Sequence, residues 1–156
     1  MADISNDDNL FAAAGERTTI GTTELNVVLF RNPSGSGKNA TLKMMTYDNT
    51  ATVSSLLRFR VYVNATVTVA GTGVSEVSLD VGSGKTAAAE CFTSPTTSAN
   101  GTLIFDLSTP GGVSTQDNKI YFPEGFQLRE NNNILITATA DGTNRIAHVS
   151  LVWEEN

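Results

Sequence analysis

Apolar and polar residues alternate along most of the chain with a period of two. In the longest such run, every second residue from Leu57 to Val69 is apolar, and Arg58, Arg60 and Tyr62 stand between them. A period of two over this length indicates a β-strand with one buried face and one polar face. The pattern therefore predicts a strand over residues 57–69.

Two hairpins are predicted from similar patterns. In the first, glycines within residues 71–73 interrupt the long run and residues 77–81 resume the alternation, as in two strands joined by a glycine turn. In the second, residues 141–144 (Asp-Gly-Thr-Asn) join a strand over 134–140 to a last strand over 145–154. In this last strand Trp153 falls on the apolar face, which predicts that it is buried.

The rest of the chain adds strands and almost no helix. Further strands are predicted over 25–31, 41–47, 103–107, 120–122 and 126–129. Only Phe11–Ala14 and Thr86–Cys91 look helical, and each is too short to form a stable helix alone. Eight to ten short strands without helices between them favour an antiparallel sandwich or barrel.

The length of 156 residues fits one domain with one core. Residues 1–16 are acidic and rich in Asn and Ala, with Ile4, Leu10 and Phe11 as the only large apolar side chains. We expect them to form an extended arm outside a β-sandwich domain of residues 17–156. Such an arm can add a strand to a neighbour's sheet or insert its apolar residues into a partner, so these three residues are candidate assembly contacts.

Composition excludes several classes of protein. The chain has 10 Lys and Arg against 16 Asp and Glu, a net charge of −6, which argues against binding to nucleic acid or to an anionic membrane. One Cys and one His cannot supply a disulfide or a closed zinc site. No apolar run is long enough to cross a bilayer, and the first ten residues lack the features of a signal peptide, so we expect the chain to be made and kept soluble.

No motif in the sequence supports catalysis. The glycine-rich segments 34–39 and 82–86 resemble a phosphate-binding loop but lack its first glycine at the required spacing. His148 is the only imidazole and has no recognisable triad partner, and Cys91 is interpreted as a packing residue. The pair Glu154-Glu155 is interpreted as a solvated tail. We therefore expect no enzyme activity, no cofactor and no metal.

Arg58, Arg60 and Tyr62 share the polar face of the longest predicted strand and are further candidate assembly contacts. One interpretation is a solvated sheet face. The other is an interface, in which the acidic residues of the arm, Asp3, Asp7 and Asp8, come from an adjacent copy.

Two segments carry a resemblance to a known family. Residues 25–38 read Leu-Asn-Val-Val-Leu-Phe-Arg-Asn-Pro-Ser-Gly-Ser-Gly-Lys, an apolar strand that leads into an Asn-Pro-Ser-Gly-Ser-Gly-Lys loop. Residues 122–128, Phe-Pro-Glu-Gly-Phe-Gln-Leu, are followed by the strand Ile-Leu-Ile-Thr-Ala and by a last strand that ends in Trp-Glu. This pattern resembles the small jelly-roll virion proteins of tailed bacteriophages.

The resemblance implies an all-β, antiparallel jelly-roll β-sandwich and a structural role in a virion. The expected function is that of a capsid decoration (cement) protein, made in the host cytoplasm, which binds the major capsid protein on the outer surface of the shell as a homotrimer. The short chain and the absence of a shaft repeat favour decoration over a fibre. Weak contacts repeated over a symmetric lattice would sum to firm attachment.

A phage fibre and a receptor- or carbohydrate-binding jelly-roll module remain as alternatives. Exposed aromatic side chains able to stack on sugars would favour the carbohydrate-binding module, and the chain has only Tyr47, Tyr62, Tyr121 and Trp153 besides its phenylalanines. An enzyme ranks third, and it would require a pocket in which His148 approaches acidic side chains.

Overall fold

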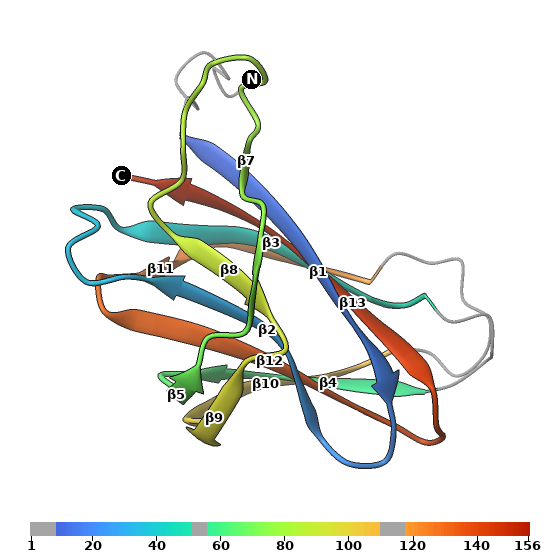
Figure 1. Ribbon diagram of the computed structural model, residues 1–156. Coiled ribbons are helices and arrows are strands. Elements are labelled where there is room, and N and C mark those ends of the chain that lie inside the picture. The colour runs from blue at the N-terminus through green and yellow to red at the C-terminus, as the bar shows by residue number, and fades with distance from the viewer. Residues whose placement is uncertain (1–8, 51–55, 110–117) are drawn as a thin grey trace.

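The computed structural model describes residues 9–50, 56–109 and 118–156. These ranges contain thirteen β-strands and no helix. Two antiparallel sheets pack face to face as a sandwich (Figure 1), which confirms the predicted all-β class. Both segments that looked helical fail to form one: Phe11–Ala14 lies within a strand, and Glu90 and Cys91 begin another.

The two sheets divide the strands almost equally. Sheet A has the order β11-β3-β13-β1-β7, and sheet B has the order β10-β4-β12-β2-β8-β6. The strands of sheet A are β1 (Leu10–Ile20), β3 (Ala40–Asn49), β7 (Val77–Ser78), β11 (Lys119–Leu128) and β13 (Arg145–Glu155). Those of sheet B are β2 (Leu25–Asn32), β4 (Leu57–Val63), β6 (Thr72–Val74), β8 (Glu90–Thr93), β10 (Thr102–Ser108) and β12 (Asn132–Ala140). A third, two-stranded ladder is formed by β5 (Thr66–Val69) and β9 (Thr96–Ala99).

Most long strands that follow one another in the chain lie in opposite sheets. The chain passes from sheet A to sheet B between β1 and β2, and it changes sheet again at each of the next two connections. The chain also passes from sheet B to sheet A between β12 and β13. These two strands do not pair with each other, so the predicted hairpin over 134–154 is wrong. The other predicted hairpin is also wrong, because β4 pairs with β10 and β12 whereas β7 pairs with β1. Alternation reports that one face of a strand is buried and does not report which strand lies beside it.

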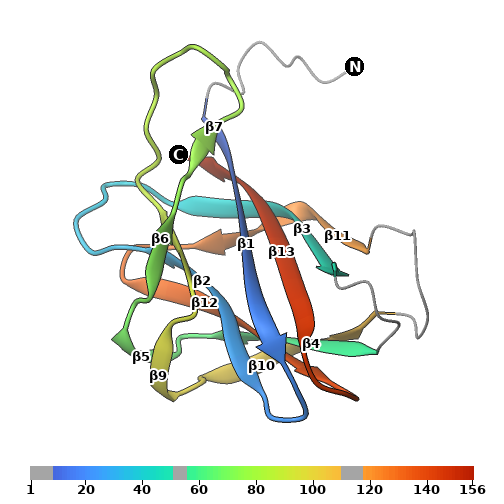
Figure 2. The same cartoon turned by 45° about the vertical axis from the view of Figure 1, so that its right-hand side comes forward.

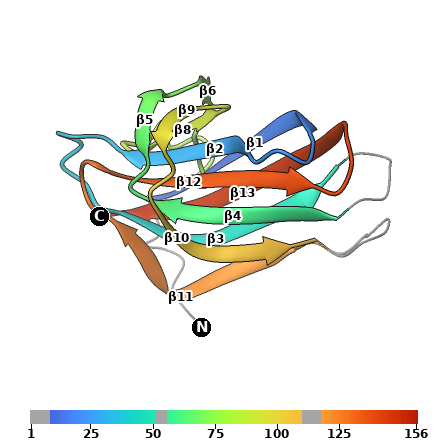
Figure 3. The ribbon, with the colours of Figure 1, turned by 90° about the horizontal axis from the view of Figure 1, so that it is seen from below.

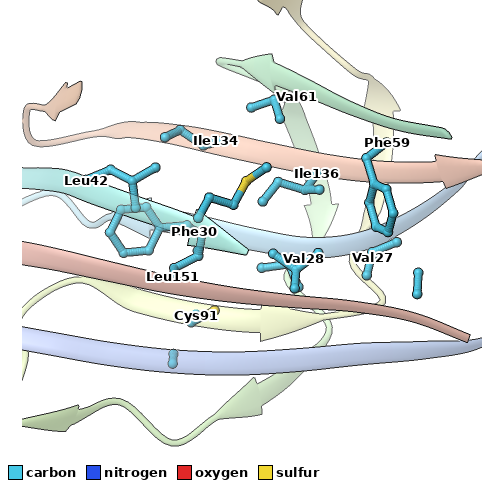
Figure 4. Close-up of a cluster of buried hydrophobic side chains, with 14 of the residues drawn as sticks. Val27, Val28, Phe30, Leu42, Phe59, Val61, Cys91, Ile134, Ile136 and Leu151 are labelled. Atoms are coloured by element: carbon cyan, nitrogen blue, oxygen red, sulfur yellow. The ribbon is translucent and has the colours of Figure 1, made fainter. Parts of the chain in front are cut away.

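The core lies between the sheets and is built around Trp153. The indole packs against Phe11 of β1 and Phe30 of β2, with ring centroids 6.0 and 4.9 Å away, and it is fully buried as predicted. Leu42, Phe59, Ile134 and Leu151 also fill this space, from strands of both sheets (Figure 4). Aromatic side chains bury the most apolar area per residue, so they contribute most to the stability of a core of this size.

The predicted N-terminal arm is wrong for residues 10–16, because they form most of β1 inside sheet A. In the pairing of β1 with β13, Phe11 is in register with Trp153, and Gly15 is in register with Val149. Phe11 and Ala13 face the core and are buried. These residues looked like an arm because small residues follow Phe11. Their small size, however, allows β1 to approach the second sheet, since a Cβ on Gly15 would lie 2.7 Å from the side chain of Thr93 in β8. Residues 1–8, which include Ile4, lie outside the described residues.

The strand predicted over 57–69 breaks after Val63. Asn64 adopts a φ of +57°, a left-handed conformation that suits Asn, and the chain leaves sheet B there to form β5. Ser94 adopts a φ of +53° at the end of β8, and β9 follows it. The ladder of β5 and β9, here called the strap (Figure 3), therefore connects β4 to β8, which stand on either side of β12 and β2.

Two asparagines fasten the strap to the outer face of sheet B, the face that points away from sheet A. Asn133 of β12 accepts from the backbone N–H of Ala65 and donates to its carbonyl, at 2.9 and 3.0 Å. Asn26 of β2 donates to the carbonyl of Pro95 at 3.0 Å. Leu29 and Leu135 pair with each other on this face and are completely buried. Because they alternate with residues of the main core, we infer that the strap is what covers them.

The two halves of the strap resemble each other, because equivalent turns occur thirty residues apart in the chain. Gly71 lies two residues after the end of β5 with a φ of +97°, Gly101 lies two residues after the end of β9 with a φ of +87°, and each is followed by Thr. A Cβ on Gly71 would lie 2.2 Å from the carbonyl oxygen of Thr93, and one on Gly101 would lie 2.2 Å from that of Val63. Each glycine therefore allows its chain to cross closely over the other half.

We predict that Gly71→Ala and Gly101→Ala each destabilise the fold by at least about 2 kcal/mol, from backbone strain together with the close contact. Gly73→Ala is the matched control, because Gly73 has open space around its Cα and no positive φ. Urea unfolding of the three variants measures the difference. Equal stability of Gly71→Ala and Gly73→Ala would contradict this account of the strap.

Candidate functional site

Arg58, Arg60 and Tyr62 lie together on the outer face of sheet B, as the alternation predicts. Arg58 forms a two-pronged ion pair with Asp106 of β10, which lies diagonally across the ladder and in register with Arg60, and Nε to Oδ1 measures 2.7 Å. Arg60 reaches Glu24 at 3.0 Å and approaches Asp106 at 3.7 Å. Each arginine therefore has an acidic partner in its own chain.

Glu24, in the connection between β1 and β2, is the centre of this cluster. Its carboxylate accepts hydrogen bonds from the Tyr62 hydroxyl at 2.8 Å and from the Thr137 hydroxyl at 2.5 Å, in addition to Arg60. Thr137 is fully buried, so the bond to Glu24 satisfies a hydroxyl that would otherwise be unpaired. We call Glu24, Arg58, Arg60, Tyr62, Asp106 and Thr137 the outer-face network.

The network shifts the pKa values of its acidic groups. Partial burial raises the pKa of Glu24, but the hydrogen bonds from Thr137 and Tyr62 and the charge of Arg60 outweigh it, so the pKa lies below the ordinary 4.5. The hydrogen bond from Arg58 lowers the pKa of Asp106. Burial, together with the bond to Glu24, raises the pKa of the Tyr62 hydroxyl. The carboxylates are held ionised and the phenol protonated, which are the states that keep the network joined.

Because both arginines are already paired within the chain, this arrangement favours the interpretation of a solvated sheet face over that of an interface with the arm. An incoming acidic arm would have to displace Asp106 or Glu24 from the arginines. Sequence reasoning missed Glu24 because it lies outside any strand, and no local pattern brings it to Thr137, 113 positions away.

We predict that Glu24→Gln removes part of the acid sensitivity of the protein. Because the folded-state pKa of Glu24 is lowered, its contribution to stability is complete above the unfolded-state pKa near 4.5 and is lost as the pH falls through the folded-state value. The variant should be less stable than the native chain at pH 7 and should lose less stability between pH 7 and pH 3. Thermal unfolding across this range measures both, with Glu16→Gln, an exposed acid of β1, as control. An unchanged pH profile would refute the role of Glu24.

Of the other candidate assembly residues, Leu10 and Phe11 belong to β1 and contact their own chain, and Ile4 lies outside the described residues. Phe11 is part of the core, and the backbone carbonyl of Leu10 accepts a hydrogen bond from Leu79 at 2.9 Å. Both residues therefore bind within their own chain, where the sequence had suggested a partner.

A different surface presents apolar side chains to solvent. The segment 75–89, here called the projecting loop, rises above one end of the sandwich (Figures 1 and 2). The alternation predicted Val77, Leu79 and Val81 to be buried, yet they are 55, 49 and 88% exposed. Their period of two is genuine, but this edge segment has no second sheet beside its apolar side.

Two glutamates, Glu155 and Glu76, hold the base of the projecting loop through hydrogen bonds to backbone N–H groups. Glu155, at the end of β13, is only 4% exposed and accepts hydrogen bonds from the backbone N–H groups of Ala88 and Ala89, the closest at 2.8 Å. It also accepts the indole N–H of Trp153 at 3.0 Å. Glu76, at the other end of the loop, accepts the N–H of Cys91 at 2.7 Å. The prediction of a solvated acidic tail is wrong for Glu155, which ties the loop to the core.

We predict that Glu155→Gln loosens the projecting loop. The amide replaces one carboxylate oxygen by an NH₂ donor that faces the N–H of Ala88, and it leaves one neutral oxygen to accept from Ala88, Ala89 and the indole. We expect the weakened acceptor and the opposed donors to cost about 1–3 kcal/mol. Hydrogen exchange at Ala88 and Ala89 should become faster. Glu154→Gln is the control, because Glu154 pairs with the half-exposed Lys43. Equal protection in both variants would contradict the proposed anchor.

The glycine loop that resembles a phosphate-binding loop is already occupied by an acid of the same chain. The backbone N–H groups of Gly35 and Gly37 donate to the two carboxylate oxygens of Glu130, at 3.1 and 2.7 Å. Successive N–H groups of this kind form an anion-binding concavity, and here its ligand is a side chain. The N–H groups of this loop therefore have a partner within the chain.

The remaining reactive groups show no catalytic arrangement. Cys91 is buried in the core, and burial followed by the charge of Glu76 raises the pKa of its thiol to about 12. His148 stands in register between Glu16 and Asp48 on the outer face of sheet A, yet the described residues show no ion pair between it and either acid. Within the same ranges no three His, Cys, Asp or Glu side chains gather in a way that could hold a metal ion.

None of the described elements is a helix of the length and apolarity that a membrane span requires. Comparison with known proteins finds no relative. No family model, no curated protein and no solved structure matches this chain.

Proposed function

We propose that this chain is a structural component of a virion, a capsid decoration protein that binds the outer surface of the shell as a homotrimer and stabilises it. The observation that carries the proposal is the projecting loop. Three aliphatic side chains stand exposed on it, while its two ends are held to the sandwich by Glu76 and Glu155. A pre-ordered apolar loop loses little conformational entropy on binding, which favours attachment.

The strand order supports a jelly roll as the finer description of the sandwich. Numbered along the chain, the long strands are β1, β2, β3, β4, β10, β11, β12 and β13. Four of them form the order first, eighth, third and sixth in sheet A, and the others form second, seventh, fourth and fifth in sheet B. Two interleaved Greek keys produce this order in jelly rolls, a fold common in viral capsid proteins. The fold alone does not determine function, so the loop remains the stronger argument.

The projecting loop lies within a long excursion between β4 and β10, which also contains the strap. Insertions of this kind add a binding feature without disturbing the eight long strands. A decoration protein needs each copy to contribute only a small contact, because the contacts repeat over the whole lattice. Three aliphatic side chains per copy suit this requirement.

We predict that the chain sediments with shells when it is co-expressed with the major capsid protein of the genome that encodes it. The double variant Leu79→Ser, Val81→Ser should remain in the supernatant, because it removes the apolar surface of the loop. Val69→Ser is the control, since the exposure of Val69, 60%, lies between that of Leu79 and that of Val81, but Val69 lies on the strap. Light scattering on the same proteins reports whether the homotrimer forms and whether the loop holds it.

Two results would overturn the proposal. One is a chain that stays in the supernatant although the shells assemble, and the other is an encoding genome that contains no capsid gene. Loss of binding in Val69→Ser with retention in the loop variant would move the contact from the loop to the strap.

A further inference from the structure

A cavity of about 300 Å³ opens at the end of the sandwich where β4, β11 and β12 meet. It is formed by the last residue of β4 and the left-handed Asn64, by the end of β11 with the residue that follows it, and by the first residue of β12. Its lining consists of Val63, Asn64, Phe126, Gln127, Leu128, Arg129 and Asn132. None of these residues belongs to the outer-face network or to the projecting loop.

The lining combines an apolar part with a polar part. Val63, Phe126 and Leu128 pack against the main core and supply apolar surface, including one aromatic ring. The other four residues carry three side-chain amides and one guanidinium. Ligand pockets commonly have this composition: apolar walls give contact area, and a few polar groups fix the orientation of the ligand.

Most of the polar groups lack a partner within the described part of the chain. The side chains of Asn64, Gln127 and Arg129 form no hydrogen bond or ion pair there, whereas Asn132 donates to the backbone carbonyl of Glu130 at 2.9 Å. Glu130 follows Arg129 directly but is bound to the glycine loop at Gly37. Arg129 therefore remains available as a donor beside the cavity.

The chemistry of these groups selects the ligand. Amide side chains both donate and accept, as the hydroxyl groups of a sugar do, and an aromatic ring can contact the C–H face of a pyranose. One cation is too little to bind a polyphosphate, and a volume of about 300 Å³ stands at the lower end of the range for ligand sites, suited to one ring. We propose that this cavity binds a single saccharide unit of a glycan. This site is independent of the proposed attachment to a capsid.

The test is saturation-transfer difference NMR with the full chain against a panel of single sugars. The panel contains glucose, galactose, N-acetylglucosamine, glucuronic acid and N-acetylneuraminic acid. We expect at least one sugar to receive saturation at millimolar concentration, and Arg129→Ala with Gln127→Ala to weaken its binding at least tenfold. Lys119→Gln is the control, because it removes an equal charge from an exposed residue at the other end of β11, the strand that Arg129 follows.

The acidic sugars show what Arg129 contributes. If Arg129 pairs with a ligand carboxylate, glucuronic or neuraminic acid binds best and Arg129→Ala alone removes that preference. If it donates to hydroxyls, the neutral sugars bind equally well. Absence of saturation transfer to every sugar, or binding that the double variant leaves unchanged, would overturn the proposal.

Discussion

The structure depends on the position of Trp153 between the two sheets. The indole ring packs against Phe11 of β1 and Phe30 of β2, so it joins neighbouring strands of sheet A to sheet B at one point. Its N–H donates to Glu155, and the same carboxylate holds the backbone of Ala88 and Ala89. One buried side chain thus connects the packing of the core to the base of the projecting loop. Because an indole N–H in a core needs a partner, the packing of Trp153 and the anchoring of the loop depend on each other.

The other exposed features are held to the sandwich in the same way, by polar side chains on strands or in the connections between them. Asn26 and Asn133 fix the strap, Glu24 joins the β1–β2 connection to β4 and β12, and Glu130 closes the glycine loop. Each is a side chain that satisfies backbone or hydroxyl groups far away in the sequence. Loops restrained like this can present a surface of fixed shape, which suits a protein that must match a partner repeatedly.

The sequence predicts the fold class and most strands, because burial of one face leaves a period of two that local reading detects. Sequence reasoning failed where burial or pairing depends on distant residues. Val77, Leu79 and Val81 show the same alternation as Leu57, Phe59 and Val61, yet only the second set has a sheet packed against it. Asn64 ends β4 by a backbone conformation that the regular pattern conceals. The thirty-residue relation between Gly71 and Gly101 was visible in the sequence as two Gly-Thr steps after similar segments, but it acquires meaning only once β5 and β9 are known to pair.

Electron cryomicroscopy of capsid shells purified together with this chain tests most directly the central proposal, that the sandwich binds a capsid through its projecting loop. The account predicts density for the sandwich in symmetric groups of three on the outer surface, with Leu79 and Val81 against the shell. Particles without this density, or a sandwich that meets the shell through another face, would contradict it.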